Sequence, residues 1–254
     1  IGAQAPRETA LRLAAEIVAA RSGRKGGGQT PQRTSPSASP VKTGVAGLVL
    51  AAGRGRRFTG GNKLAAPIDG RPVLRHVVEN ALACRLDPVI VVLGFQAEQG
   101  IDALRGVEDP RLRVVFNPRW EGGKASSIEA GLREVPYTAA GVVSLLGDMP
   151  MVKSWLIERV LAEFELSGRL VFPVYAGPDG QRKGYPTAFP RALFEEMREL
   201  TGDETANAAA LRHWSEAVKI VLKDTSTQAD VDTTTDLELL AGLAQDEEQA
   251  FESH

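Results

Sequence analysis

The chain has 254 residues, 43% hydrophobic and 24% charged, which is enough for one sizeable α/β domain plus a small appendage. A formal net charge of -2 argues against binding nucleic acid through a basic surface, and no apolar run is long enough to cross a bilayer. The N-terminus lacks the basic flank and apolar core of a signal peptide. A single cysteine, Cys84, excludes an intrachain disulfide, so we expect a cytoplasmic protein.

The N-terminal part differs in composition from the rest of the chain. Residues 1–21 carry apolar side chains at helical spacing, which predicts a short amphipathic helix. Residues 22–42 are mostly Gly, Ser, Thr and Pro and predict a flexible linker, because such a stretch buries too little surface to offset its ordering entropy. We expect the folded domain over residues 43–244 and a frayed acidic tail over residues 245–254.

From Val45 onward, short apolar runs alternate with helical patterns. In chain order we expect a strand at Val45–Ala51, a helix at Pro72–Cys84, a strand at Val89–Leu93, a helix at Ala97–Leu104, a strand at Leu112–Phe116, a helix at Ser126–Glu134, a strand at Val142–Leu146, a helix at Ser154–Glu165, a strand at Leu170–Val174, helices at Arg191–Leu200 and Thr205–Trp214, a strand at Val218–Leu222 and a helix at Asp236–Ala244. The strand runs are apolar throughout, which is typical of parallel strands covered on both faces. The alternation predicts a doubly wound, mostly parallel α/β sheet of the Rossmann-like type, with ligands bound at the carboxyl ends of its strands.

The first predicted strand leads into a glycine-rich basic loop. The segment Leu48–Leu64 contains four glycines and four Arg or Lys side chains. Glycines let backbone N–H groups approach a phosphate, and the cations neutralise it. The loop is not a Walker A motif, because Leu64 follows Lys63, and not a dinucleotide fingerprint, because Phe58 replaces the third glycine. A surface turn with solvated charges is the alternative.

The fourth predicted strand leads into Gly147-Asp148-Met149-Pro150. A carboxylate held at the end of a buried strand is well placed for Mg²⁺, which prefers one or two carboxylates together with phosphate oxygens. A turn or helix-cap role is the alternative for Asp148. The phosphate loop at another strand end favours the metal.

The pattern LAAG-x-G-x-R-F…NKL resembles the opening signature of the MobA-like nucleotidyltransferases, particularly the molybdenum cofactor cytidylyltransferases. The resemblance implies that this loop grips an NTP triphosphate. It implies nucleotide contacts at Ala51, Ala52, Gly53, Gly55, Arg57 and Lys63, with Arg57, Lys63 and Asp148 as catalytic residues. The chain carries one residue more between Arg57 and Lys63 than is usual in the family.

The same resemblance extends to two acidic segments. Gly147–Pro150 is similar to the family's Gly-Asp-x-Pro, whose Asp binds Mg²⁺. Residues 229–240 resemble the family's closing segment, in which Asp232 matches the second metal ligand. Asp230 would lie on the opposite face of an extended segment. We expect Asp236 to cap the last helix, with Thr235 as a rival cap.

The segment Phe116–Leu132 resembles the family's nucleotide-pocket segment. The resemblance makes Asn117, Gly122 and Ser127 candidates for base or ribose contacts, whereas an ordinary serine cap at Ser126 or Ser127 is the alternative. The AAG of residues 51–53 is closer to the cytidylyltransferase version than the AGG of the guanylyltransferases, which favours CTP.

The segment Tyr175–Phe189 resembles the family's acceptor-side segment, although Tyr185 stands where the family has His. Candidate acceptor contacts are Arg182, Lys183 and Gly184; the alternative for the two cations is solvated charges in a hairpin. No His/Cys cluster supports zinc.

Residues 1–23 resemble the final helix of XdhC-type maturation factors, so we expect a fragment of a fusion. Together the resemblances imply a Mg²⁺-dependent CTP:molybdopterin cytidylyltransferase that docks on a molybdenum hydroxylase such as a xanthine dehydrogenase-like enzyme. The alternatives are a GTP-using guanylyltransferase, a sugar- or alditol-phosphate nucleotidyltransferase, and a non-catalytic carrier of the molybdenum cofactor.

Overall fold

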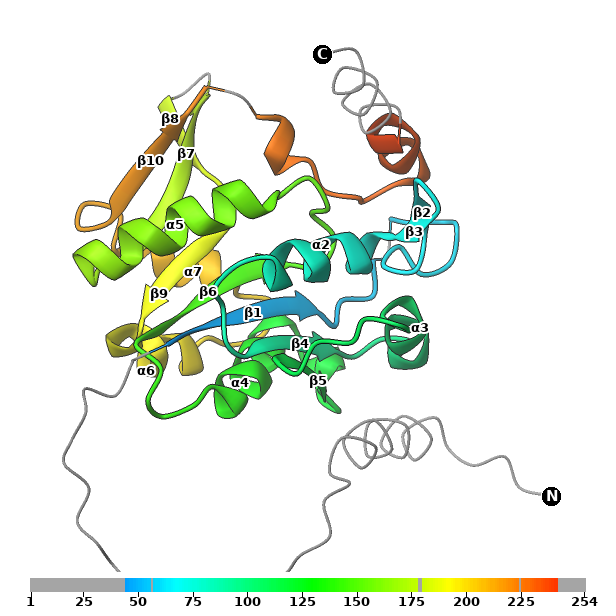
Figure 1. Cartoon of the computed structure of the whole chain (residues 1–254), viewed down its shortest axis with the longest axis horizontal. Helices are drawn as coiled ribbons and strands as arrows, with labels where there is room; N and C mark the ends of the chain where they lie inside the picture. Colours follow the sequence, from blue (N-terminus) through cyan, green and yellow to red (C-terminus); the bar gives the residue numbers. More distant parts are fainter. Residues whose placement is uncertain (1–43, 56, 178–179, 224, 242–254) are drawn as a thin grey trace, which may run out of the picture.

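The computed structural model describes residues 44–55, 57–177, 180–223 and 225–241 (Figure 1). The expected N-terminal helix, the linker over residues 22–42 and the acidic tail lie outside the described residues and stay predictions. Within the described ranges, no helix is long and apolar enough to cross a membrane.

One mixed sheet forms the centre of the described part of the chain. Its strands are β1 (Val45–Ala51), β4 (Val89–Leu93), β5 (Leu112–Phe116), β6 (Gly141–Leu146), β7 (Val171–Gly177), β8 (Gly180–Lys183), β9 (Thr187–Pro190) and β10 (Val218–Leu222). The order is β10-β7-β9-β6-β1-β4-β5, with β8 paired to β7. The pairs of β1 with β4 and β6, of β4 with β5 and of β7 with β10 are parallel, which confirms the predicted fold class.

Two antiparallel strands were not predicted from the sequence. β9 lies between β6 and β7 and is antiparallel to both, and β8 forms a hairpin with β7. The segments are only four residues long, and β8 is largely exposed, so neither carries a recognisable apolar run.

Helices cover both faces of the sheet (Figure 1). They are α2 (Val73–Leu82), α3 (Ala97–Ala103), α4 (Lys124–Glu134), α5 (Ser154–Ser167), α6 (Phe194–Arg198) and α7 (Ala206–Arg212), and a last helical segment spans residues 234–241. The apolar faces of α2, α3 and α5 join one core with the sheet, while those of α4, α6 and α7 join a second core on the other face. This arrangement is the doubly wound architecture that the alternation predicts.

Two predicted helix caps were wrong. α4 begins at Lys124, because Gly123 with φ 101° marks the boundary, and Ser126 lies inside the helix with its hydroxyl donating to the Gly123 carbonyl at 2.8 Å. The last helix is capped by Thr233, whose hydroxyl accepts from the Asp236 amide at 3.2 Å while the Asp236 carboxylate accepts from the Thr233 amide at 2.7 Å. This reciprocal pair satisfies the free amides at the helix start.

A third, smaller core lies beside the main sheet. Its buried members are Phe58, Ile68, Val73, Met151, Val231 and Leu240. Ile68 belongs to a short hairpin, β2 (Pro67–Ile68) and β3 (Arg71–Pro72), that the sequence did not predict. This core joins the glycine loop to the C-terminal segment, so it fixes the relative positions of the two parts of the site described next.

Candidate functional site

Three chain segments meet at the carboxyl ends of β1 and β6: the loop of residues 52–64, the turn of residues 147–150 and the C-terminal segment of residues 229–233. The first two are adjacent because β1 and β6 are parallel neighbours, with Leu50 paired to Leu146. A Cβ on Gly147 would lie 2.8 Å from the Ala51 Cβ. Only glycine therefore allows the turn before Asp148 to approach the end of β1 this closely.

Lys63 connects all three segments. Its Nζ lies 2.5 Å from Asp148 Oδ2 and 3.3 Å from Asp232 Oδ1. The Lys63 side chain is only 10% exposed. Burial alone would lower its pKa, but the ion pairs with Asp148 and Asp232 outweigh burial and raise the pKa above the ordinary value. Lys63 is therefore a permanently charged group held between two carboxylates.

Arg57 contacts Asp232 from the solvent side. Its guanidinium donates to Asp232 Oδ2, and its side chain is 74% exposed. The structure thus brings together the four residues predicted from widely separated motifs: Arg57, Lys63, Asp148 and Asp232.

Gly55 shapes the loop around the lysine. It has φ +57°, and a Cβ at this position would lie 3.1 Å from the Lys63 Cδ and 3.3 Å from its Cε and Cγ. Glycine is therefore needed at position 55 for two reasons: it tolerates the left-handed backbone conformation, and it leaves room for the side chain of Lys63. Gly53 is exposed with open space around it, whereas Ala51 and Ala52 are buried, so contacts of these three with a nucleotide stay predictions.

The carboxylates fit a hard divalent cation. Oxygens of Asp148 and Asp232 converge on one position, which the Lys63 ammonium occupies. Asp230 lies nearby: its partial burial, followed by the negative charges of Asp232 and Asp148, raises the pKa of its carboxyl group. No group of three His, Cys, Asp or Glu side chains arranged to hold a metal occurs among the described residues. Mg²⁺ commonly binds through two carboxylates completed by substrate phosphates, so a pair is sufficient.

Asn117 and Ser127 have structural partners. The buried Asn117 amide donates to Ser126 Oγ at 2.9 Å and to Ser127 Oγ at 3.1 Å, and its oxygen accepts from the Arg119 amide at 2.9 Å. These bonds fix the start of α4 at the end of β5. Gly122 is exposed in the short 3-10 turn Trp120–Gly122. Direct base contacts of the three predicted residues stay predictions.

A pocket of about 410 Å³ lies beside the carboxylates. It is lined by Leu146, Met149, Tyr175, Ala176, Gly177, Arg182, Lys183, Tyr185, Thr225, Gln228 and Asp230. Asp230 lines this pocket, whereas Asp232 pairs with Arg57 and Lys63. The expectation that these two carboxylates lie on opposite faces was wrong, because side chains two residues apart share a face of an extended segment, and Asp230 is close enough to Asp232, Asp148 and Lys63 for their charges to act on its pKa. Two of the three predicted acceptor residues, Arg182 and Lys183, belong to this lining.

Gln228 is a residue of this pocket that the sequence did not indicate. Its side chain accepts from the Tyr185 amide at 2.7 Å and donates to the Tyr185 carbonyl at 2.9 Å. A Cβ on Gly184 would lie 2.2 Å from Gln228 Oε1, so Gly184 is needed for packing. A lone Gln before an acidic segment gives no signal of this role, because its partner lies 43 residues away.

Lys183 lies inside the acceptor segment and is not a solvated hairpin charge. Its Nζ donates to the Gly184 carbonyl at 3.0 Å and to Thr187 Oγ1 at 2.5 Å, and lies 4.4 Å from the centre of the Tyr185 ring. Burial lowers its pKa from 10.5 to about 7. The amine is thus easily deprotonated near neutral pH.

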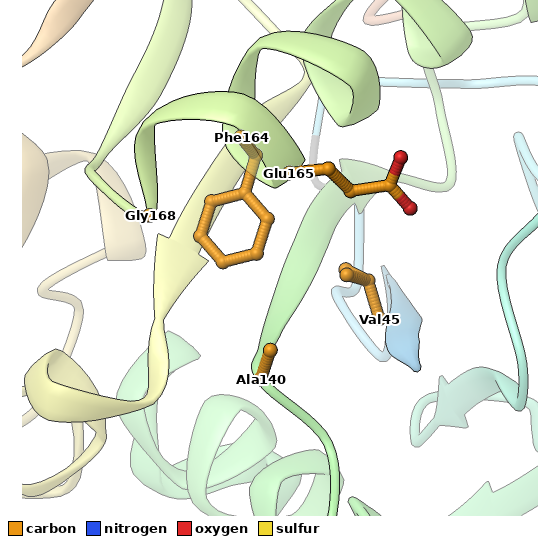
Figure 2. Close-up of a pocket in the computed structure, with 5 residues that line it drawn as sticks. All are labelled: Val45, Ala140, Phe164, Glu165 and Gly168. Carbon is orange, nitrogen blue, oxygen red and sulfur yellow. The ribbon is translucent and has the colours of Figure 1, made fainter. Parts of the chain in front are cut away.

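A second pocket, of about 280 Å³, lies at the amino ends of β1 and β6, opposite to the strand ends that carry Lys63 and Asp148 (Figure 2). It is lined by Val45, Ala140, Phe164, Glu165 and Gly168. The Glu165 carboxylate points away from the Phe164 ring and pairs with Arg85 at 3.0 Å. Its lining residues offer no cationic or catalytic group, so we place the functional site at the carboxyl ends of the strands.

The strand ends of this doubly wound sheet carry a cationic glycine loop that faces two carboxylates. This combination is typical of the α/β proteins that bind nucleotides. Comparison with known proteins specifies the family. Residues 47–219 match the MobA-like NTP transferase domain, and the chain belongs to this family of nucleotidyltransferases. Lys63 and Asp148 lie within the matched range, and Asp232 lies beyond it.

Individual relatives are moderately similar. The chain is 29% identical over 193 residues to nicotine blue oxidoreductase from Paenarthrobacter nicotinovorans, covering 74% of this chain and 92% of that protein. It is 28% identical over 178 residues to a probable molybdenum cofactor guanylyltransferase from Haloferax mediterranei, covering 69% and 78%. The crystal structure of Rv0371C in complex with manganese, from Mycobacterium tuberculosis, is 26% identical with a TM-score of 0.61, covering 79% of this chain and 99% of that one.

Proposed function

We propose that this protein is a CTP:molybdopterin cytidylyltransferase, which forms the dinucleotide form of the molybdenum cofactor and releases pyrophosphate. The observation that carries this proposal is the Lys63 ammonium between Asp148 and Asp232, at the mouth of a glycine loop and beside the acceptor pocket. The similarity to the probable guanylyltransferase supports the acceptor class.

In this mechanism the chain binds and orients two anions. The glycine loop, Arg57 and Lys63 hold the triphosphate and neutralise it. An oxygen of the acceptor's terminal phosphate bonds to the α-phosphorus of CTP, the bond from that phosphorus to the bridging oxygen breaks, and pyrophosphate leaves with the electron pair. The acceptor is already anionic near neutral pH, so positioning and charge neutralisation supply the catalysis.

Asp148 and Asp232 would hold Mg²⁺, which supplies additional charge neutralisation at the phosphates. Their oxygens converge on one position, and the related Rv0371C structure contains manganese. Both observations support a divalent cation at this position.

The acceptor would occupy the pocket of Arg182, Tyr185 and Gln228. Arg182 offers a planar cation to a phosphate, and the Tyr175 and Tyr185 rings offer flat apolar walls to a pterin. The base choice of CTP over GTP depends on residues 51–53.

Pyrophosphate release measured with each NTP, with and without molybdopterin, tests the proposal. We expect release only with both substrates present, and faster with CTP. Release with GTP alone among the NTPs would indicate a guanylyltransferase instead. Release with a sugar or alditol phosphate, but not with molybdopterin, would show that the acceptor is that phosphate and not molybdopterin. Binding of molybdopterin without turnover of any NTP would favour the carrier function.

A further inference from the structure

The Lys63 ammonium occupies the position at which the two acidic side chains converge. Asp148 and Asp232 approach it at 2.5 Å and 3.3 Å, and Asp230 adds a third negative charge nearby. An ammonium and a divalent cation cannot share this position, because like charges a few ångströms apart repel strongly in a partly buried site. Lys63 and a metal ion therefore compete for the same oxygens.

The geometry also gives Lys63 a second set of partners. Its stem passes against Gly55, so the side chain that ends at the carboxylates also lies along the loop expected to hold phosphates. A triphosphate in that loop would offer Lys63 a stronger anionic partner than the carboxylates.

Building on the proposed function, we propose that Lys63 exchanges partners: it blocks the carboxylate pair when no nucleotide is bound, and the triphosphate draws it away so that the metal binds. Nucleotide and metal then bind cooperatively, and by linkage each raises the affinity of the other by the same factor. The exchange would keep free divalent metal out of the site until a nucleotide arrives.

Binding of Mn²⁺, followed by electron paramagnetic resonance of the free ion, tests this exchange without any turnover. The proteins are the full chain, Lys63→Met, Arg57→Met and Asp148→Asn, each with and without a non-hydrolysable α,β-methylene analogue of CTP. Arg57→Met is the matched control, since it also removes one cation from Asp232 but from the exposed side. Lys63→Gln serves as a second variant if Lys63→Met does not fold.

Without nucleotide, we expect Lys63→Met to bind Mn²⁺ about tenfold more tightly than the full chain, and Arg57→Met to change the affinity by less than about threefold. The analogue should tighten Mn²⁺ binding far more in the full chain than in Lys63→Met. Equal or weaker Mn²⁺ binding by both Lys63 variants, with binding still dependent on Asp148, would overturn the exchange alone. Binding of Mn²⁺ that is insensitive to Asp148→Asn would overturn the metal assignment and the exchange together.

Discussion

The backbone carbonyl of Asp148 accepts a hydrogen bond from the amide of Val231 at 2.9 Å. This bond fastens the C-terminal segment to the end of β6. The Val231 side chain is fully buried in the small core with Phe58, so the neighbouring residue, Asp232, is turned toward Lys63. A single backbone contact thus sets the spacing of two carboxylates that lie far apart in the sequence.

Asp148→Asn is expected to reduce pyrophosphate release by about 100-fold or more, because the amide keeps the shape but loses the charge that holds the cation. Steady-state pyrophosphate assays measure this, with circular dichroism to show that the fold is intact. Glu98→Gln, which neutralises an exposed carboxylate on α3, is the control and should retain full activity. Activity of Asp148→Asn within a fewfold of the full chain would contradict the metal assignment.

Gly55→Ala is expected to raise the KM for the NTP by about tenfold. The new Cβ would press on the Lys63 stem at 3.1 Å, and the left-handed backbone costs about 1 kcal/mol for an alanine. Gly70→Ala is the matched control, since Gly70 has φ +73° but open space around its Cβ position. Urea unfolding should show a similar loss of stability in both variants, while only Gly55→Ala changes the KM. Equal KM values in the two variants would show that the contact with Lys63 is unimportant.

Phe58→Ala is expected to loosen the glycine loop and the C-terminal segment together. Phe58 is buried in the core that joins them, and truncating a buried Phe costs about 3 kcal/mol. Hydrogen exchange should rise in residues 57–64 and 229–241 and stay unchanged in β4. Tyr137→Ala removes an aromatic side chain that is 89% exposed and should change neither region. Faster exchange in the loop alone would show that this core does not couple the segments.

Stability should rise with pH between about pH 7 and about pH 8.5 because of Lys183. Burial lowers its folded-state pKa from 10.5 to about 7, so in this range the unfolded chain binds the proton that the folded protein has released. Folding therefore releases this proton, and rising pH favours the folded state by on the order of 1 kcal/mol after allowance for partial solvent access. Urea midpoints across this range provide the measurement.

Lys183→Met tests whether Lys183 causes this pH dependence. The variant should show a smaller increase in stability between about pH 7 and about pH 8.5, and it should unfold at a higher urea concentration near pH 7. Cys84 does not interfere, because burial raises its thiol pKa from 9.0 to about 12 and its opposite effect begins above pH 9. An unchanged slope in Lys183→Met would assign the pH dependence to other groups.

Much of the fold is encoded in local sequence. β4 spans the predicted residues because an uninterrupted apolar run bounded by turns favours a buried parallel strand. β5 also spans the predicted residues, although Arg113 interrupts its apolar run and it lies at the edge of the sheet. β9 was missed because a four-residue strand is specified by its two neighbours, β6 and β7, and not by its own pattern. The α4 start was misplaced because Ser126 looks like a cap, whereas the φ of Gly123 and the bonds of Asn117 decide the boundary.

The sequence by itself determined the chemistry of the site: a glycine-rich cationic loop at one strand end, an acidic turn at another and a closing acidic segment, each recognisable because its residue types are unusual at those places. Only the tertiary structure decided that these groups share one position. Lys63 lies 85 residues from Asp148 and 169 from Asp232, and nothing local fixes the distance between them. That distance is set by the parallel pairing of β1 with β6 and by the small core around Phe58, because long-range contacts alone hold distant segments against chain entropy.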